Sequence, residues 1–334
     1  MESIYIKGRG YVLKSDPWIE DGNLVMITDA NPTAFRVHRG VLARHSEVFN
    51  DMLKLPQPKE DAETFERCQV VSIYDSPVAL GNLFKALYDG PNFSNSCRED
   101  FFNLASILRL STKYFISHLR RQAIDFLAQT WGVTLEGHDL MVETALSAPR
   151  DSDFTYPYVH PMHLLNLARE TNAQLLVPAA FYFLSLYTLS DILKADHPKL
   201  LVDHIAKPSS QITPTDVMYY SLVYQQRLQY IETFLHTFCA ERAAHPICSE
   251  AQACSKGFAR MLSSLHRSWN LRTGVLHFIL QTIRKVQNDR TLCSLCRNNF
   301  EREASIFRQN IWDELPQIVS LSSWEKLQAP QKVL

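Results

Sequence analysis

The first 130 residues combine short β-type runs with amphipathic helical stretches. Leu24–Thr28 is a run of β-forming residues, and residues 35–38, which follow a turn at Asn31-Pro32, alternate apolar and polar side chains. This pattern predicts a β-hairpin. Apolar positions then recur at helical spacing from Val41 to Met52. A further strand is predicted over Cys68–Ile73, and further helices over Pro77–Tyr88, 101–110 and 116–128. Because the strands come early and do not alternate regularly with helices, an α+β domain is expected.

The pattern changes after residue 131. Residues 132–160 are rich in Gly, Pro and Asp and have weak periodicity, which predicts a linker or a loop with one short helix. Beyond Pro161 the strand signal largely disappears. Helices are predicted over 162–171, 175–189, 214–239, 251–269, 275–287 and 300–315. The chain is therefore expected to hold an α+β domain over 16–130, a linker over 131–160 and an all-α region over 161–330.

Composition narrows the classes of partner. Lys and Arg number 34 against 35 Asp and Glu, and the nearest thing to a basic patch is the pair Arg284-Lys285, which argues against a nucleic-acid partner. The longest apolar stretch, 175–189, is interrupted by Pro178 and falls short of a membrane span. The start of the chain lacks the apolar core of a secretory signal, and seven cysteines form no even disulfide set. A cytoplasmic or nuclear location is expected.

One stretch of the α+β domain carries a specific motif, Phe35-x-Val37-His38-Arg39-x-Val41-Leu42-Ala43-x-x-Ser46-x-x-Phe49-x-x-Met52. With it, residues 16–130 resemble the BTB/POZ family. The resemblance implies a short sheet capped by a cluster of helices, and a non-catalytic protein–protein interaction module that binds a protein partner or itself. The motif residues taken as its core are Phe35, His38, Arg39, Val41, Leu42, Ser46, Phe49 and Met52.

His38 has two interpretations. It could be a metal ligand or catalytic base, or a structural histidine that hydrogen-bonds the backbone; no second His, Cys or carboxylate is placed to join it, which favours the structural role. The helical region is also similar to the extension of fungal, mushroom-type BTB proteins, through residues 164–170, 175–182, 311–316 and the Trp324-Glu325-x-Leu327 tail. That resemblance implies no biochemical activity.

Three departures from the family pattern bear on function. The residues before the first strand are not helix-patterned, although BTB domains often dimerise through an N-terminal helix and strand. Asn23 stands where transcription-factor members pair an Asp with the Arg that is Arg39 here, and Pro58-Lys59-Glu60 matches the cullin-binding pattern poorly. A substrate adaptor of a cullin-type ubiquitin ligase and a nuclear transcription-regulatory scaffold therefore stand as alternatives to a general interaction module.

Four cysteines in the second half form a candidate metal site. Cys248-x5-Cys254 and Cys293-x2-Cys296 could supply two thiolates each to one tetrahedral Zn²⁺. Such a zinc would be structural, since four sulfurs leave no open position. The alternative is a set of unrelated buried thiols. Cys68, Cys97 and Cys239 are expected to be plain thiols.

Other chemistry is weakly supported. His160 and His163 lack a third ligand, and Glu60, Asp61 and Glu63 lie in a polar stretch typical of a solvated loop. No phosphate-binding loop and no nucleophile elbow occurs. The sequence proposes no catalytic residue and no small-molecule substrate, so we expect a protein that is not an enzyme.

Overall fold

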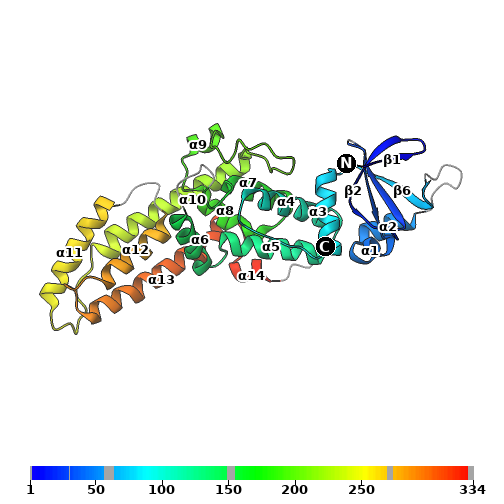
Figure 1. The fold of residues 1–334 in the computed structure, drawn as a ribbon. Helices are drawn as coiled ribbons and strands as arrows, with labels where there is room; N and C mark the ends of the chain where they lie inside the picture. The colour runs from blue at the N-terminus through cyan, green and yellow to red at the C-terminus, as the bar shows by residue number, and fades with distance from the viewer. Residues whose placement is uncertain (1, 30, 56–63, 149–154, 269–273, 330–334) are drawn as a thin grey trace. The chain divides into compact units, whose positions relative to one another are not determined.

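The structure is a computed structural model that describes residues 2–29, 31–55, 64–148, 155–268 and 274–329 (Figure 1). The chain divides into two compact units. The first consists of Met1–Leu127 and Asp203–Pro208, and the second of Ala128–Val202 and Ser209–Gln331. Among the described residues, no helix is both long and apolar enough to cross a lipid bilayer.

The first unit is built on a six-stranded sheet with the order β1-β2-β4-β3-β6-β5. Its strands are β1 (Ser3–Ile6), β2 (Gly10–Trp18), β3 (Leu24–Thr28), β4 (Thr33–Val37), β5 (Thr64–Phe65) and β6 (Cys68–Ile73). The predicted hairpin is β3 and β4, which pair antiparallel with Leu24 opposite Val37. β6 joins β3 in parallel, and β2 joins β4 in parallel.

Both faces of the central strands are buried. Leu24 and Met26 of β3 lie in the larger core cluster, whereas Val25 and Ile27 lie in a smaller cluster on the opposite face. Because successive side chains point to opposite faces of a strand, a strand covered on both sides needs apolar residues at every position. All five residues of β3 are accordingly buried.

The hairpin of β1 and β2 was not predicted, and it extends the sheet before residue 16. Gly8 and Gly10 have φ of +90° and +81°, a conformation that glycine adopts without steric cost. Ile6 and Val12 are buried in the smaller core cluster. The polar and glycine residues between them mask the period-2 pattern, so only the tertiary burial identifies these strands.

The single helix predicted from Val41 to Met52 is wrong, because the structure has two helices there. α1 (Arg39–His45) and α2 (Glu47–Lys54) are separated by Ser46, whose backbone is extended. A serine favours the N-cap position because its hydroxyl accepts a bond from the next helical turn. The apolar spacing is continuous across this break, so periodicity alone cannot reveal it.

Three longer helices complete the first unit: α3 (Pro77–Tyr88), α4 (Arg98–Lys113) and α5 (Ser117–Trp131), whose end enters the second unit. Leu80, Leu83 and Phe84 of α3 are fully buried in the larger core cluster. The segment Asp203–Pro208 also packs here: the His204 ring stacks on Phe102 with ring centroids 4.5 Å apart. These contacts place a distant piece of chain in the core of the first unit.

The described part of the second unit contains only helices as regular elements, which confirms the all-α prediction. They are α6 (Leu135–Ser147), α7 (Pro161–Glu170), η1 (Gln174–Leu176), α8 (Val177–Leu184), α9 (Leu189–Lys194), α10 (Pro214–Glu232), the π-helical η2 (Thr233–Cys239), α11 (Ala251–Ser268), α12 (Val275–Gln287), α13 (Ser294–Ile318) and α14 (Trp324–Gln328). Every residue of α8 is buried, as expected of a helix that is apolar all round.

Two predicted features of this unit differ in the structure. The helix predicted over 175–189 is divided into η1, α8 and α9, since Pro178 lies in the first turn of α8 and Thr188 caps α9 by accepting a bond from the Asp191 N–H. Residues 131–160, expected as a linker or a loop with one short helix, hold the 13-residue α6, which contributes to the core. His138 of α6 is 1% exposed and packs on Phe183 with ring centroids 5.5 Å apart.

Candidate functional site

The four cysteines of the candidate metal site come from two helix starts. Cys248 lies in the turn before α11, and Cys254 lies in the first turn of that helix. Cys293 is the N-cap residue of α13, and Cys296 lies in its first turn. α11 and α12 form the helical excursion that spans the 38 residues between Cys254 and Cys293. The positive ends of the helix dipoles of α11 and α13 favour thiolates at these positions.

The sulfur atoms lie at distances that suit one metal ion. All four lie within 4.8 Å of one another. The Cys248 sulfur is 3.7 Å from that of Cys254 and 3.5 Å from that of Cys293. A disulfide has sulfurs about 2 Å apart. Tetrahedral Zn²⁺ with bonds of about 2.3 Å separates its sulfur ligands by about 3.8 Å. The predicted juxtaposition of the four cysteines is therefore confirmed, and its dimensions match zinc better than disulfides.

Each of the four sulfurs also accepts a hydrogen bond from a backbone N–H. The N–H of Glu250 donates to Cys248 at 3.4 Å, and the N–H of His245 donates to Cys296 at 3.3 Å. Cys254 accepts from the Cys293 N–H at 3.3 Å, and Cys293 from the Cys296 N–H at 3.4 Å. Such donors stabilise sulfur in its thiolate form, the form that binds metal. A set of unrelated buried thiols does not require this arrangement.

The thiols differ in acidity because their surroundings differ. The bond from the Cys296 N–H lowers the pKa of Cys293 to about 7. Burial raises the pKa of Cys296 to about 12 and also raises the pKa of Cys254. A metal ion must displace the protons held by these two buried thiols, so metal binding strengthens as the pH rises.

The packing around the cysteines leaves little freedom. A Cβ on Gly257 would lie 2.7 Å from the Cδ2 of Leu292, so a larger residue on α11 would require the Leu292 side chain to shift. Phe258 and Phe300 are buried beneath the site, with stacked rings 6.0 Å apart. These apolar side chains hold the two helix starts, and with them the four sulfurs, in place.

Sequence reasoning missed Arg242, which lies beside this site. Its guanidinium is 5.1 Å from the ring centroid of Phe238 and 5.2 Å from that of Phe300. It also pairs with the Glu303 carboxylate. The interaction joins η2 to α13 through cation–π and ion-pair contacts. No sequence pattern connects residues so far apart along the chain.

Most of the motif residues in the first unit serve its core. Phe35, Leu42 and Phe49 are fully buried, and Met52 packs against them while partly exposed. Val41 is half-buried. The Phe35 ring meets that of Phe84 edge to face, with centroids 5.4 Å apart. These residues account for the fold rather than for a ligand site.

Ser46 and His38 use their polar atoms within the domain. The Ser46 Oγ accepts from the Phe49 N–H at 3.0 Å and donates to the Tyr114 carbonyl oxygen at 2.6 Å. The Tyr88 hydroxyl lies 3.1 Å from the His38 Nδ1 and accepts from the His38 N–H at 2.7 Å. Burial raises the pKa of Tyr88. The bonds to Tyr88 match the structural interpretation. The expectation that no carboxylate joins His38 is wrong, because the Asp21 carboxylate lies 3.3 Å from its Nε2.

Arg39 and Asn23 do not form a charged pocket. The Asn23 side-chain oxygen accepts from the Arg39 backbone N–H at 2.8 Å, at the start of α1. The Arg39 guanidinium donates to the Leu53 carbonyl oxygen. Asn23 thus supports the helix start, and the guanidinium is engaged by the backbone of α2.

The other candidates of the sequence are not assembled into a site. The His160 Nδ1 accepts from the Met162 N–H at 3.1 Å, whereas the His163 Nε2 lies 3.3 Å from the Ser210 hydroxyl. Burial lowers the pKa of His160 to about 2. Residues 58–60 and the acidic residues Glu60, Asp61 and Glu63 lie outside the described residues.

A comparison with known protein families supports the resemblance of the first unit to the BTB/POZ family. Residues 24–130 match the family model of the BTB/POZ domain. The match runs from β3 to the end of α5, which makes this part of the chain a BTB/POZ domain, followed by a mostly helical region. A comparison with curated proteins finds no match. The similarity of the helical region to fungal, mushroom-type members stays a prediction.

Proposed function

We propose that this chain is a non-catalytic protein-binding protein of the cytoplasm or nucleus, in which the BTB/POZ domain contacts a protein partner or a second copy. The match of residues 24–130 carries the proposal, since a BTB/POZ domain is a protein–protein interaction module. The motif residues support it, because Phe35, Leu42 and Phe49 are used for packing. A scaffold of this kind acts through its surface.

The outer face of the β1–β2 hairpin is the first surface to test. Tyr5 and Tyr11 lie opposite each other in the pairing and are 62% and 77% exposed. Their rings meet edge to face at 5.5 Å, and Leu13 on the same face is also exposed. Tyrosines are enriched at protein interfaces, where a rigid apolar ring with a polar tip contributes much contact energy. The face is therefore suited to a protein partner.

Size-exclusion chromatography with light scattering on the full chain tests self-association through this face. We expect a concentration-dependent rise above the monomer mass of 38.4 kDa, which Tyr5→Ser/Tyr11→Ser abolishes. The matched control Tyr74→Ser changes an 86% exposed tyrosine elsewhere in the first unit. A monomer at every concentration refutes self-association and leaves a hetero-partner. Proximity labelling in cells then tests the proposal: a set of labelled proteins that is identical for wild type and the double variant refutes the role of this face.

For the four cysteines, the proposal is one structural Zn²⁺ held by Cys248, Cys254, Cys293 and Cys296. The ion would cross-link the starts of α11 and α13, and four sulfur ligands leave no position for a substrate. Native mass spectrometry of the full chain should find one zinc per chain, which Cys296→Ser removes. The exposed Cys97 provides the control, since Cys97→Ser should leave the zinc content unchanged. Metal-free wild-type protein after purification with added zinc would refute the site.

Two narrower roles remain alternatives within this proposal. Co-purification of a cullin scaffold would identify a ubiquitin-ligase adaptor. Binding of a co-repressor would identify a transcription-regulatory scaffold, although the engagement of Arg39 by the Leu53 carbonyl argues against a charged-pocket mode.

A further inference from the structure

The sequence segment that contains the four cysteines is basic, although the whole chain is not. From Cys248 to Arg297 the sequence has eight Lys and Arg and only Glu250 and Asp289 as acids, a net charge of +6 against −1 for the chain. Whole-chain counts concealed this excess, and the pair Arg284-Lys285 noted in the sequence is only part of it. Clustered charge of one sign favours partners of the opposite sign.

Several of these cations already interact with other residues of the chain. Arg284 pairs with Glu143, and Lys285 donates to the Ser264 hydroxyl at 2.5 Å. The Arg297 guanidinium donates to the carbonyl oxygens of Asp289 and Leu292. By contrast, Lys256, Arg260 and Arg290 form no ion pair with any carboxylate in the described parts of the chain.

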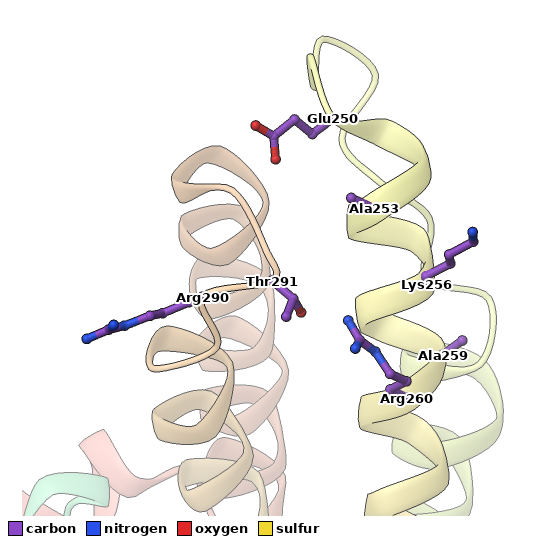
Figure 2. A pocket seen from close by; sticks show the side chains of 7 residues that line it. All are labelled: Glu250, Ala253, Lys256, Ala259, Arg260, Arg290 and Thr291. Atoms are coloured by element: carbon purple, nitrogen blue, oxygen red, sulfur yellow. The ribbon is translucent and has the colours of Figure 1, made fainter.

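These three cations border one groove. It has a volume of about 680 Å³ and lies between α11 and the turn that joins α12 to α13. Figure 2 shows Arg260 directed from α11 toward Thr291, while Lys256 and Arg290 extend to opposite sides. Ala253 and Ala259 also line the groove and leave space between the charged side chains. The lining of the groove thus combines small apolar side chains with long, flexible cationic side chains.

The local acids neutralise the charge of the groove only in part. The Asp289 carboxylate accepts from the Thr291 N–H at 2.8 Å and from its hydroxyl at 2.7 Å, and these bonds lower the pKa of Asp289. Arg260 lowers it further through its charge. Glu250 lies at one end of the groove. The groove is thus lined by three cations and one carboxylate, Glu250, and the nearby Asp289 carboxylate is held by Thr291 of the turn.

The geometry points to a docking site for an acidic segment of a protein partner in this groove, which rests on the proposed role of the chain in protein binding. Guanidinium groups bind carboxylates in bidentate geometry, and small apolar side chains of the segment would contact Ala253 and Ala259. A nucleic acid is a poorer fit, because no aromatic side chain lines the groove for base stacking. The neighbouring cysteine cluster would hold α11 against the turn and so fix the groove.

Fluorescence anisotropy of the zinc-loaded full chain tests the site. The probe is a fluorescein-labelled 12-residue peptide of Glu-Glu-Ala repeats, compared with its Lys-Lys-Ala counterpart. We expect saturable binding of the acidic probe alone, which weakens at least about tenfold in Arg260→Glu/Arg290→Glu and falls with added salt. Arg44→Glu/Arg121→Glu makes the same charge change at exposed positions of the first unit and should leave affinity within about twofold.

Several outcomes would overturn the inference. Equal binding by the groove variant and wild type would do so, as would no saturable binding, or equal weakening in the control pair. Tighter binding of a 12-nucleotide DNA would identify a nucleic-acid surface, and loss of self-association in the groove variant would identify a second copy. Loss of zinc from this variant would show that the cations serve the thiolate cluster instead. Tyr5→Ser/Tyr11→Ser should not change peptide binding, so failure of the hairpin proposal stays distinguishable.

Discussion

Ser46 makes two hydrogen bonds at the break between α1 and α2, and replacement by alanine removes both. One caps α2 through the Phe49 N–H, and the other satisfies the Tyr114 carbonyl oxygen at the end of α4. Loss of a serine N-cap costs about 1 kcal/mol. A buried polar group that loses its partner costs about 1–3 kcal/mol. We expect Ser46→Ala to lower the free energy of unfolding of the first unit by about 2–4 kcal/mol.

Hydrogen exchange of the full chain, read by mass spectrometry of peptides, measures this loss for each unit separately. Peptides from α2 and α4 that exchange through unfolding of the first unit should exchange at least about 30-fold faster, because about 1.4 kcal/mol corresponds to a factor of ten. Peptides from α8 should be unaffected. Ser46→Thr keeps the hydroxyl and should retain most of the protection. An increase below about threefold in Ser46→Ala would show that the two bonds contribute little.

Three further predictions concern the core, the metal and pH. Phe49→Ala, which removes a fully buried ring stacked on Tyr114 at 4.2 Å, should destabilise the first unit by about 3–5 kcal/mol. Met52→Ala should cost less because that side chain is partly exposed, and equal losses in urea denaturation would contradict the assigned packing. A zinc chelator should lower the melting temperature of the second unit alone, measured by calorimetry, and an unchanged transition would argue against a structural metal. His160, whose folded pKa of about 2 lies below the usual 6.5, stays neutral in the fold, so the unfolded chain binds the extra proton below pH 6.5. Its contribution to stability is complete above pH 6.5 and falls by about 1.4 kcal/mol at pH 5.5. His160→Asn keeps an N-cap acceptor and should show a correspondingly smaller change in urea midpoint between pH 7 and 5.5; identical changes in both proteins would disprove the assignment.

Local pattern determined much of this fold. The alternation in β4 and the apolar run of β3 predicted the central hairpin, because the faces that a strand buries follow from the order of apolar and polar residues within the strand itself. Helical spacing likewise predicted α3, α10, α11 and α12. The cysteine spacing identified all four members of the candidate metal site, since the chemistry of a zinc ligand restricts the residue type.

Tertiary structure decided the features that depend on contacts between residues far apart in the chain. The β1–β2 hairpin is ordered by burial against strands that come later, and α6 becomes part of the core because His138 meets Phe183 from another helix. Gly257 of α11 packs close to Leu292, and nearby lie together the sulfurs of Cys254 and Cys293, which have 38 residues between them. The basic groove beside them arises from the same approach. Sequence determined the central hairpin, most of the helices and which cysteines are candidate metal ligands. Long-range packing decided the remaining elements and which residues meet, because the energy of such contacts depends on residues distant in the chain.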